Sequence, residues 1–71
     1  MRLEQVLPAL REGKTITRVR QKEFGSLVFF VKIEDAKLKF KFISSSGETM
    51  KWASYTLKTE DVISDNWEIA G

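Results

Sequence analysis

The sequence predicts an α+β fold: an N-terminal helix packed on a small antiparallel β-sheet, with a short second helix before the C-terminal strand. Three observations predict it: helical periodicity at the start, alternating apolar and polar residues in the middle, and an acidic helix start near the end. We expect residues 1–71 to form a single domain, because a chain this short supports only one hydrophobic core.

The first element is an amphipathic helix within residues 3–12. Apolar residues recur there at helical spacing, namely Leu3, Val6, Leu7 and Leu10. Gly13 follows at the position of a C-cap glycine. Because Pro8 removes a backbone donor inside this segment, we expect a late start, a kink or a wide first turn.

The middle of the chain predicts three strands. Residues 15–19 are rich in β-branched side chains, and residues 20–25 are interpreted as a polar connection. Residues 26–33 and 37–42 are expected to pair as a hairpin around a turn at residues 34–36. Residues 26–33 are apolar on both faces, which one small chain can hardly bury, so we expect a homo-oligomer, a dimer or a tetramer.

The last third predicts short elements. Residues 49–52 favour a strand. Thr59 is expected to cap a helix of one or two turns with Val62 and Ile63 on its buried face. Trp67 is expected to fill the core at the start of a last short strand or a closing tail.

The composition argues against catalysis. The chain has no cysteine and no histidine, which excludes disulfides, thiolate nucleophiles and imidazole ligands or proton shuttles. The adjacent carboxylate pairs are explained by a turn and by a helix start. We therefore expect no enzyme activity, no cofactor and no metal. No apolar run approaches the roughly 20 residues of a membrane span, so we expect a cytoplasmic protein without membrane contacts.

Charge is distributed unevenly. Residues 1–42 carry ten Lys or Arg against five Asp or Glu, and residues 43–71 carry two against five. This asymmetry suits an anionic ligand near the front, head-to-tail contact between subunits, or merely solvated charge. The outward residues Lys37, Lys39 and Lys41 fit a solvated sheet face, a nucleic-acid surface, or electrostatic steering of a small anion.

Two further features are compatible with ligand binding. Arg18, Arg20 and Lys22 form a basic cluster in an expected turn region, where arginine forks suit phosphate as well as solvent. Trp52 stands beside polar residues at a strand end, where it fits stacking on a flat ring as well as core packing.

Three motifs extend over nearly the whole chain. Residues 3–18 read L-x-x-V-L-x-A-L-x-x-G-K-x-I-x-R, and Gly47 precedes W-A-S at residues 52–54. Residues 61–68 read D-V-I-S-D-N-W-E. In this order around a hairpin, the motifs resemble the phage-encoded Thoeris anti-defence sponge family.

The resemblance implies a non-enzymatic homo-oligomer in the host cytoplasm that sequesters a cyclic nucleotide immune signal, such as a cyclic ADP-ribose isomer or a cyclic oligonucleotide. The pockets would lie between subunits. Gln21 stands where the family usually has a tryptophan, and Phe24 is the aromatic residue that could replace it. The implied ligand-binding residues are therefore Arg18, Gln21, Phe24, Trp52 and Ser54.

Two other functions remain open. Because relatives are also linked to anti-CRISPR activity, one alternative is a protein–protein inhibitor of a host defence enzyme such as a CRISPR effector. The other is a small nucleic-acid-binding protein that uses the lysine face.

Overall fold

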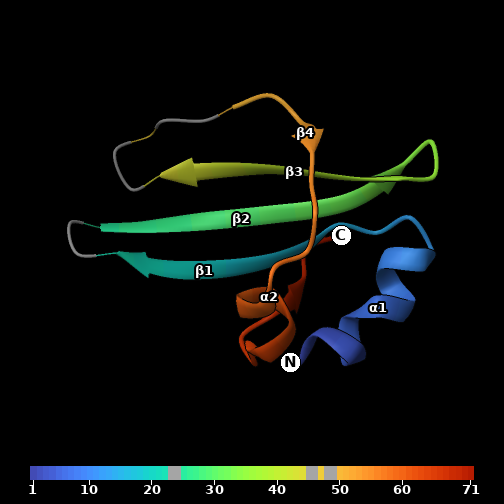
Figure 1. Ribbon diagram of the computed structural model, residues 1–71, viewed down its shortest axis with the longest axis horizontal. Coiled ribbons are helices and arrows are strands. Elements are labelled where there is room, and N and C mark those ends of the chain that lie inside the picture. The colour runs from blue at the N-terminus through green and yellow to red at the C-terminus, as the bar shows by residue number, and fades with distance from the viewer. Residues whose placement is uncertain (23–24, 45–46, 48–49) are drawn as a thin grey trace.

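A five-stranded antiparallel sheet forms the centre of the computed structural model (Figure 1). The structure describes residues 1–22, 25–44, 47 and 50–71, without the side chains of residues 21 and 22. The elements follow in the order α1 (Leu3–Arg11), β1 (Ile16–Lys22), β2 (Gly25–Glu34), β3 (Lys37–Ser44), β4 (Ala53–Ser54), α2 (Thr59–Ile63) and β5 (Glu68–Ile69). The strand order is β4-β3-β2-β1-β5. The predicted α+β class is confirmed.

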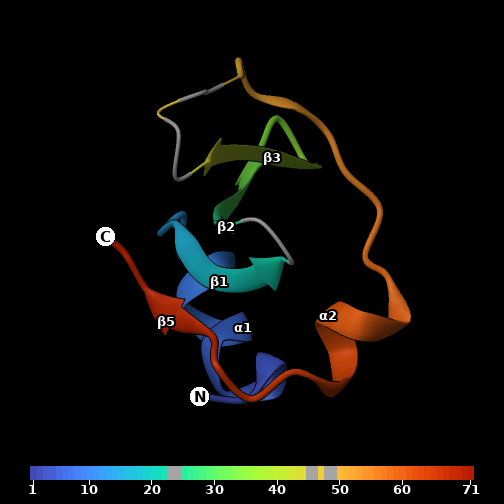
Figure 2. The same cartoon turned by 90° about the vertical axis from the view of Figure 1, so that its left-hand side faces the viewer.

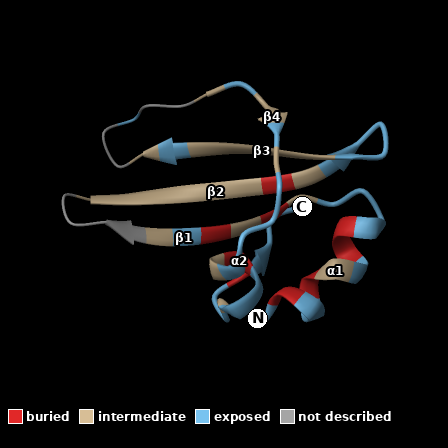
Figure 3. Cartoon of the chain, viewed as in Figure 1, coloured by how far each residue is buried: buried red, intermediate tan, exposed pale blue. Residues whose placement is uncertain are grey.

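Both helices lie on the same face of the sheet, which we call the covered face (Figure 2). The strand register aligns Ile16, Val31 and Phe40 across β1, β2 and β3 on this face. The core consists of Leu3, Val6, Leu10, Ile16, Val31 and Trp67 (Figure 3). Trp67 is fully buried, which confirms its predicted place in the core.

Helix α1 begins at Leu3, the first residue of the predicted segment. The Gln5 side chain accepts the Arg2 backbone N–H at 2.7 Å, which satisfies a donor at the helix start and stabilises the first turn. The expectation of a late start is therefore wrong, and Pro8 lies inside the helix on its exposed side. Gly13 has a φ of 90°, so its role in ending the helix is confirmed.

The three central strands are longer than predicted. Strand β1 continues to Lys22, so residues 20–22 belong to the sheet, because each of them pairs with a residue of β2. The β2–β3 hairpin is confirmed, with Asp35 and Ala36 both at positive φ, as in a two-residue turn of type I′.

The strand predicted over residues 49–52 is displaced. Residues 50–52 are not in a strand, and residue 49 lies outside the described residues. The strand is instead Ala53–Ser54, which pairs with Phe40 and Lys39 at the edge of the sheet.

Helix α2 presents a different residue to the core than expected. Its N-cap is Lys58, so Thr59 is the first helical residue and does not act as the cap. Asp61 is its buried residue, whereas Val62 and Ile63 are 55% and 75% exposed. The predicted buried face is wrong because the helix turns a carboxylate inward, toward an arginine of β1.

Strand β2 is only partly covered by this chain. Of its ten residues, Val31 alone is buried, and the others are half-buried or exposed. This leaves the expected homo-oligomer as a prediction. No helix in the described part of the chain has the length and apolar character needed to cross a bilayer.

Candidate ligand-binding site

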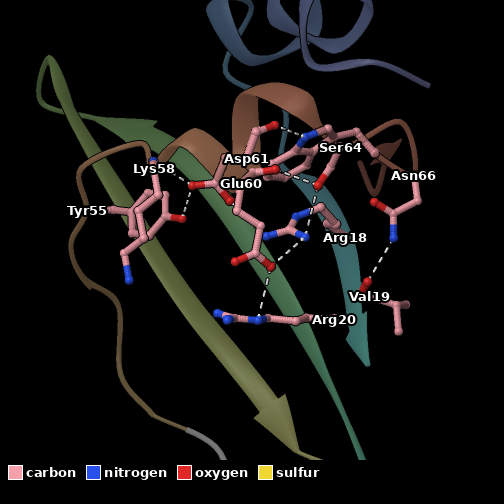
Figure 4. Close-up of polar contacts among 10 residues, drawn as sticks. Arg18, Val19, Arg20, Tyr55, Lys58, Glu60, Asp61, Ser64 and Asn66 are labelled. Atoms are coloured by element: carbon pink, nitrogen blue, oxygen red, sulfur yellow. Dashed lines mark hydrogen bonds and ion pairs between the residues drawn. The ribbon is translucent and has the colours of Figure 1, made fainter. Parts of the chain in front are cut away.

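A buried arginine lies at the centre of the covered face. Arg18 follows Ile16 by two positions in β1, so both side chains point to the same side of the sheet. Only 6% of Arg18 is exposed. Its Nη2 donates to Asp61 Oδ1 at 2.9 Å, and its Nη1 donates to Ser64 Oγ at 3.2 Å (Figure 4). Burial of this cation is thus compensated by a carboxylate from α2.

The Asp61 carboxylate joins the sheet to the segment that precedes α2. Besides the Arg18 guanidinium, it accepts the Lys58 backbone N–H at 2.9 Å and the Tyr55 hydroxyl. The bond from Lys58 satisfies a free donor at the start of α2. Residues 55–58, which we call the strap, cross the sheet between β4 and α2 (Figure 1). Asp61 therefore holds both ends of the strap against Arg18.

The environment of Tyr55 suppresses its ionisation. Burial raises the pKa of the phenol, and the hydrogen bond to the Asp61 carboxylate and its negative charge raise it further. An acid whose pKa is raised on folding contributes stability that is present below its unfolded pKa and is lost as the pH rises. The free energy of unfolding should therefore fall as the pH rises above about 10, the ordinary tyrosine pKa.

This effect is directly measurable because Tyr55 is the only tyrosine. We expect the phenolate absorbance of the folded chain to develop at clearly higher pH than that of the urea-unfolded chain, with no such signal in Tyr55→Phe. Coincident titrations of the folded and unfolded chains would contradict the bond to Asp61.

A cavity of about 260 Å³ lies between the strap and the covered face of the sheet. Three aromatic rings contribute to its wall, with the Phe40 and Tyr55 centroids 4.8 Å apart and those of Phe29 and Phe40 6.5 Å apart. The remaining lining residues are charged or carry a hydroxyl: Arg18, Arg20, Ser54, Thr56, Lys58, Glu60 and Asp61. The cavity therefore combines flat apolar surface with cationic groups, a combination suited to a ring that carries an anion.

The two arginines at the cavity differ in how readily their guanidinium groups can bind a ligand. Arg18 is buried against Asp61, and its Nε has no hydrogen-bond partner among the described residues. The Arg20 side chain is 38% exposed and its Nε lies 3.1 Å from Glu60 Oε1, on a carboxylate that is 42% exposed. Exposed ion pairs contribute only about 0–1 kcal/mol, so an incoming phosphate can replace Glu60 as the partner of Arg20.

The structure places the predicted site residues in different locations. Arg18 and Ser54 line the same cavity. Trp52 lies on the other face of the sheet, with Lys32 Nζ 4.3 Å from its ring centroid. The Gln21 side chain and Phe24 lie outside the described residues. Of the five candidates, the structure thus brings two together.

The basic cluster also needs a correction. Arg18 and Arg20 lie in β1 and not in a turn, since β1 extends to Lys22. Side chains two residues apart on a strand share a face, which is why both reach the cavity. The side chain of Lys22 lies outside the described residues.

Sequence reasoning missed the acidic and phenolic members of the site. Tyr55 and Asp61 were not recognised as site residues. Arg18 lies two positions after Ile16 in a strand, so it must point inward as Ile16 does, and a buried arginine requires a carboxylate partner. This two-residue spacing was the feature of the sequence from which a buried arginine could have been predicted. Which carboxylate supplies the partner depends on the path of the strap, which has no local sequence signature.

Comparisons of the chain with protein-family models, curated proteins and solved structures found no match.

Proposed function

We propose that this chain is a non-catalytic phage counter-defence protein that binds and sequesters a nucleotide-derived immune signal, either a cyclic ADP-ribose isomer or a cyclic oligonucleotide. The observation that carries the proposal is the cavity under the strap. It places aromatic rings beside Arg20, a guanidinium whose ion-pair partner among the described residues is a half-exposed carboxylate. A base or ribose would lie against the rings, and a phosphate would accept hydrogen bonds from Arg20. The three motifs that resemble the sponge family support the same ligand class.

The size of the cavity supports a site completed by a second subunit. Ligand pockets usually enclose about 300–1,000 Å³, whereas this cavity measures about 260 Å³. It can hold one part of a cyclic nucleotide, with the rest of the ligand outside the strap. On the covered face, Leu27 and Phe29 of β2 are only half-buried, which is a second reason to propose a dimer or tetramer. A neighbouring subunit on that face would enclose the exposed part of the ligand.

The proposal is tested by ligand retention. The protein is incubated with cyclic ADP-ribose isomers and cyclic dinucleotides, freed of unbound ligand by size exclusion, and heated to release what it holds. We expect recovery of intact nucleotide, from a peak whose light-scattering mass corresponds to a dimer or tetramer. A folded protein that retains no nucleotide, or one that releases a hydrolysed product, would contradict the proposed sequestration.

Two substitutions at one ion pair should act in opposite directions. Arg20→Gln should weaken nucleotide binding about tenfold, because a charge-assisted bond to phosphate is lost. Glu60→Gln should strengthen binding, because it removes the carboxylate that competes with phosphate for Arg20. Arg11→Gln is the matched control, since Arg11 is exposed on α1. Titration calorimetry on variants with unchanged circular dichroism gives these affinities, and equal losses in Arg20→Gln and Arg11→Gln would exclude Arg20 from the site.

A further inference from the structure

The face of the sheet opposite the helices is open, and we call it the open face. No helix of the described chain lies on it (Figure 2). The register pairs Phe30 with Lys41, and Lys32 with Lys39, and strand alternation turns all four side chains away from the covered face. None of these four residues is buried. The open face is therefore accessible and basic.

Trp52 adds an aromatic ring to the open face. Although residues 50–52 are not in a strand, β4 holds the chain at the edge of β3, and the indole lies beside the lysines. Lys32 Nζ is 4.3 Å and Lys41 Nζ is 5.2 Å from the Trp52 ring centroid. Lys41 Nζ is also 5.6 Å from the Phe30 ring centroid. Two rings and three lysines thus share one surface.

Most of the positive charge on this surface has no acidic partner among the described residues. Lys32 pairs with Glu34 at 2.8 Å, and this bond and the charges of Lys32 and Lys39 lower the pKa of Glu34. Neither Lys39 nor Lys41 has an ion-pair partner within 4.0 Å among the described residues. A ligand with several phosphates would supply the missing negative charge.

We propose that the open face binds single-stranded nucleic acid, with lysines contacting phosphates and bases stacking on Trp52 and Phe30. Unpaired bases can stack on aromatic side chains, and this mode of binding tolerates any base sequence. In a duplex the bases are paired and stacked on one another, so a duplex would contact only the lysines of this face, through its phosphates. A second copy of this face is disfavoured as the occupant, because a two-fold contact would bring Lys39 and Lys41 against like charges.

The test uses a fluorescently labelled oligothymidylate of about 12 nucleotides and a duplex of the same length. We expect the single strand to bind more tightly than the duplex in anisotropy titrations. Affinity should fall with the logarithm of salt concentration at a slope of about −2, as expected for about three neutralised phosphates on a single strand.

Matched variants assign the binding to this face. Trp52→Ala should weaken binding on the order of tenfold, with partial rescue by Trp52→Phe, because phenylalanine also stacks on a base. The double variant Lys39→Gln/Lys41→Gln should weaken binding and bring the salt slope closer to zero. The control variant Arg11→Gln/Lys14→Gln removes the same charge from the end of α1 and should bind nearly as the parent does.

Three results would overturn the proposal. One is equal loss in the two double variants, which would indicate attraction by net charge alone. Another is binding of duplex as tight as binding of single strand. The third is a parent protein that binds no oligonucleotide at low salt while Trp52→Ala lowers its light-scattering mass, which would make the open face a subunit interface. Because the cavity is on the covered face, nucleotide retention should stay unchanged in all of these variants.

Discussion

Replacement of Asp61 by alanine is expected to lower the free energy of unfolding by about 3–5 kcal/mol, because the buried Arg18 guanidinium would lose its carboxylate partner. The Tyr55 hydroxyl and the Lys58 backbone N–H would lose their acceptor as well. Natural domains have total stabilities of about 5–15 kcal/mol, and one of this size is expected near the lower limit. Urea unfolding followed by circular dichroism should therefore show a variant that retains only about 0–2 kcal/mol of stability, so that part of it is already unfolded without denaturant.

Two further variants separate the loss of the ion pair from the loss of a carboxylate. Asp65→Ala removes an exposed carboxylate nearby and should change stability by no more than about 0.5 kcal/mol. The double variant Arg18→Met/Asp61→Leu should recover much of the stability lost in Asp61→Ala, because apolar side chains replace both buried charges. If the double variant is no more stable than the single one, the unpaired arginine is not the cause of the loss.

Local periodicity made the helix and the hairpin predictable. Helix α1 needs only apolar residues at helical spacing and a terminal glycine, and both are explicit in residues 3–13. The hairpin was predicted from the apolar segment 26–33 and the alternating segment 37–42 on either side of a short turn. The turn residues Asp35 and Ala36 are at positive φ although neither is a glycine. These elements depend on neighbours close in sequence, so the sequence alone was sufficient.

The site was not predictable in the same way, because its geometry depends on contacts between distant residues. Arg18 and Asp61 are separated by 43 positions, and only the fold makes them partners. Expecting α2 to bury Val62 and Ile63 followed hydrophobicity, but in a five-residue helix the inward position went to Asp61. The need to compensate a buried cation outweighed the burial of two apolar side chains on that turn.

The position of Trp52 illustrates a second limit. In the sequence, Phe40 and Phe42 alternate to the face opposite the lysines at positions 37, 39 and 41. The structure adds an aromatic ring from another segment, because β4 brings Trp52 alongside Lys32 and Lys41. Strand alternation describes one strand at a time and cannot reveal a ring supplied across the sheet edge.

The two tryptophans are expected to respond very differently to truncation. Trp67→Ala should destabilise the fold by about 3–5 kcal/mol, since this side chain is fully buried and its removal leaves a cavity in the core. Trp52→Ala should have a much smaller effect, because Trp52 is half-buried on the open face. Urea unfolding of the two variants provides the comparison, and similar losses would contradict the placement of Trp52 outside the core.

Trp67 is also expected to be energetically coupled to the ion pair. Its Nε1 donates to the Asp61 carbonyl oxygen at 2.9 Å, and the Arg18 guanidinium carbon lies 5.4 Å from its ring centroid. Trp67→Phe keeps an aromatic ring but removes this donor. It should therefore lower the free energy of unfolding less than Trp67→Ala does, while weakening the attachment of α2 to the core. In a double-mutant cycle, Trp67→Phe and Asp61→Asn should therefore show a coupling energy of about 0.5–3 kcal/mol. Strict additivity would mean that the core and the cavity wall are stabilised independently. The hydrogen bond from Trp67 to α2 would then not couple them energetically.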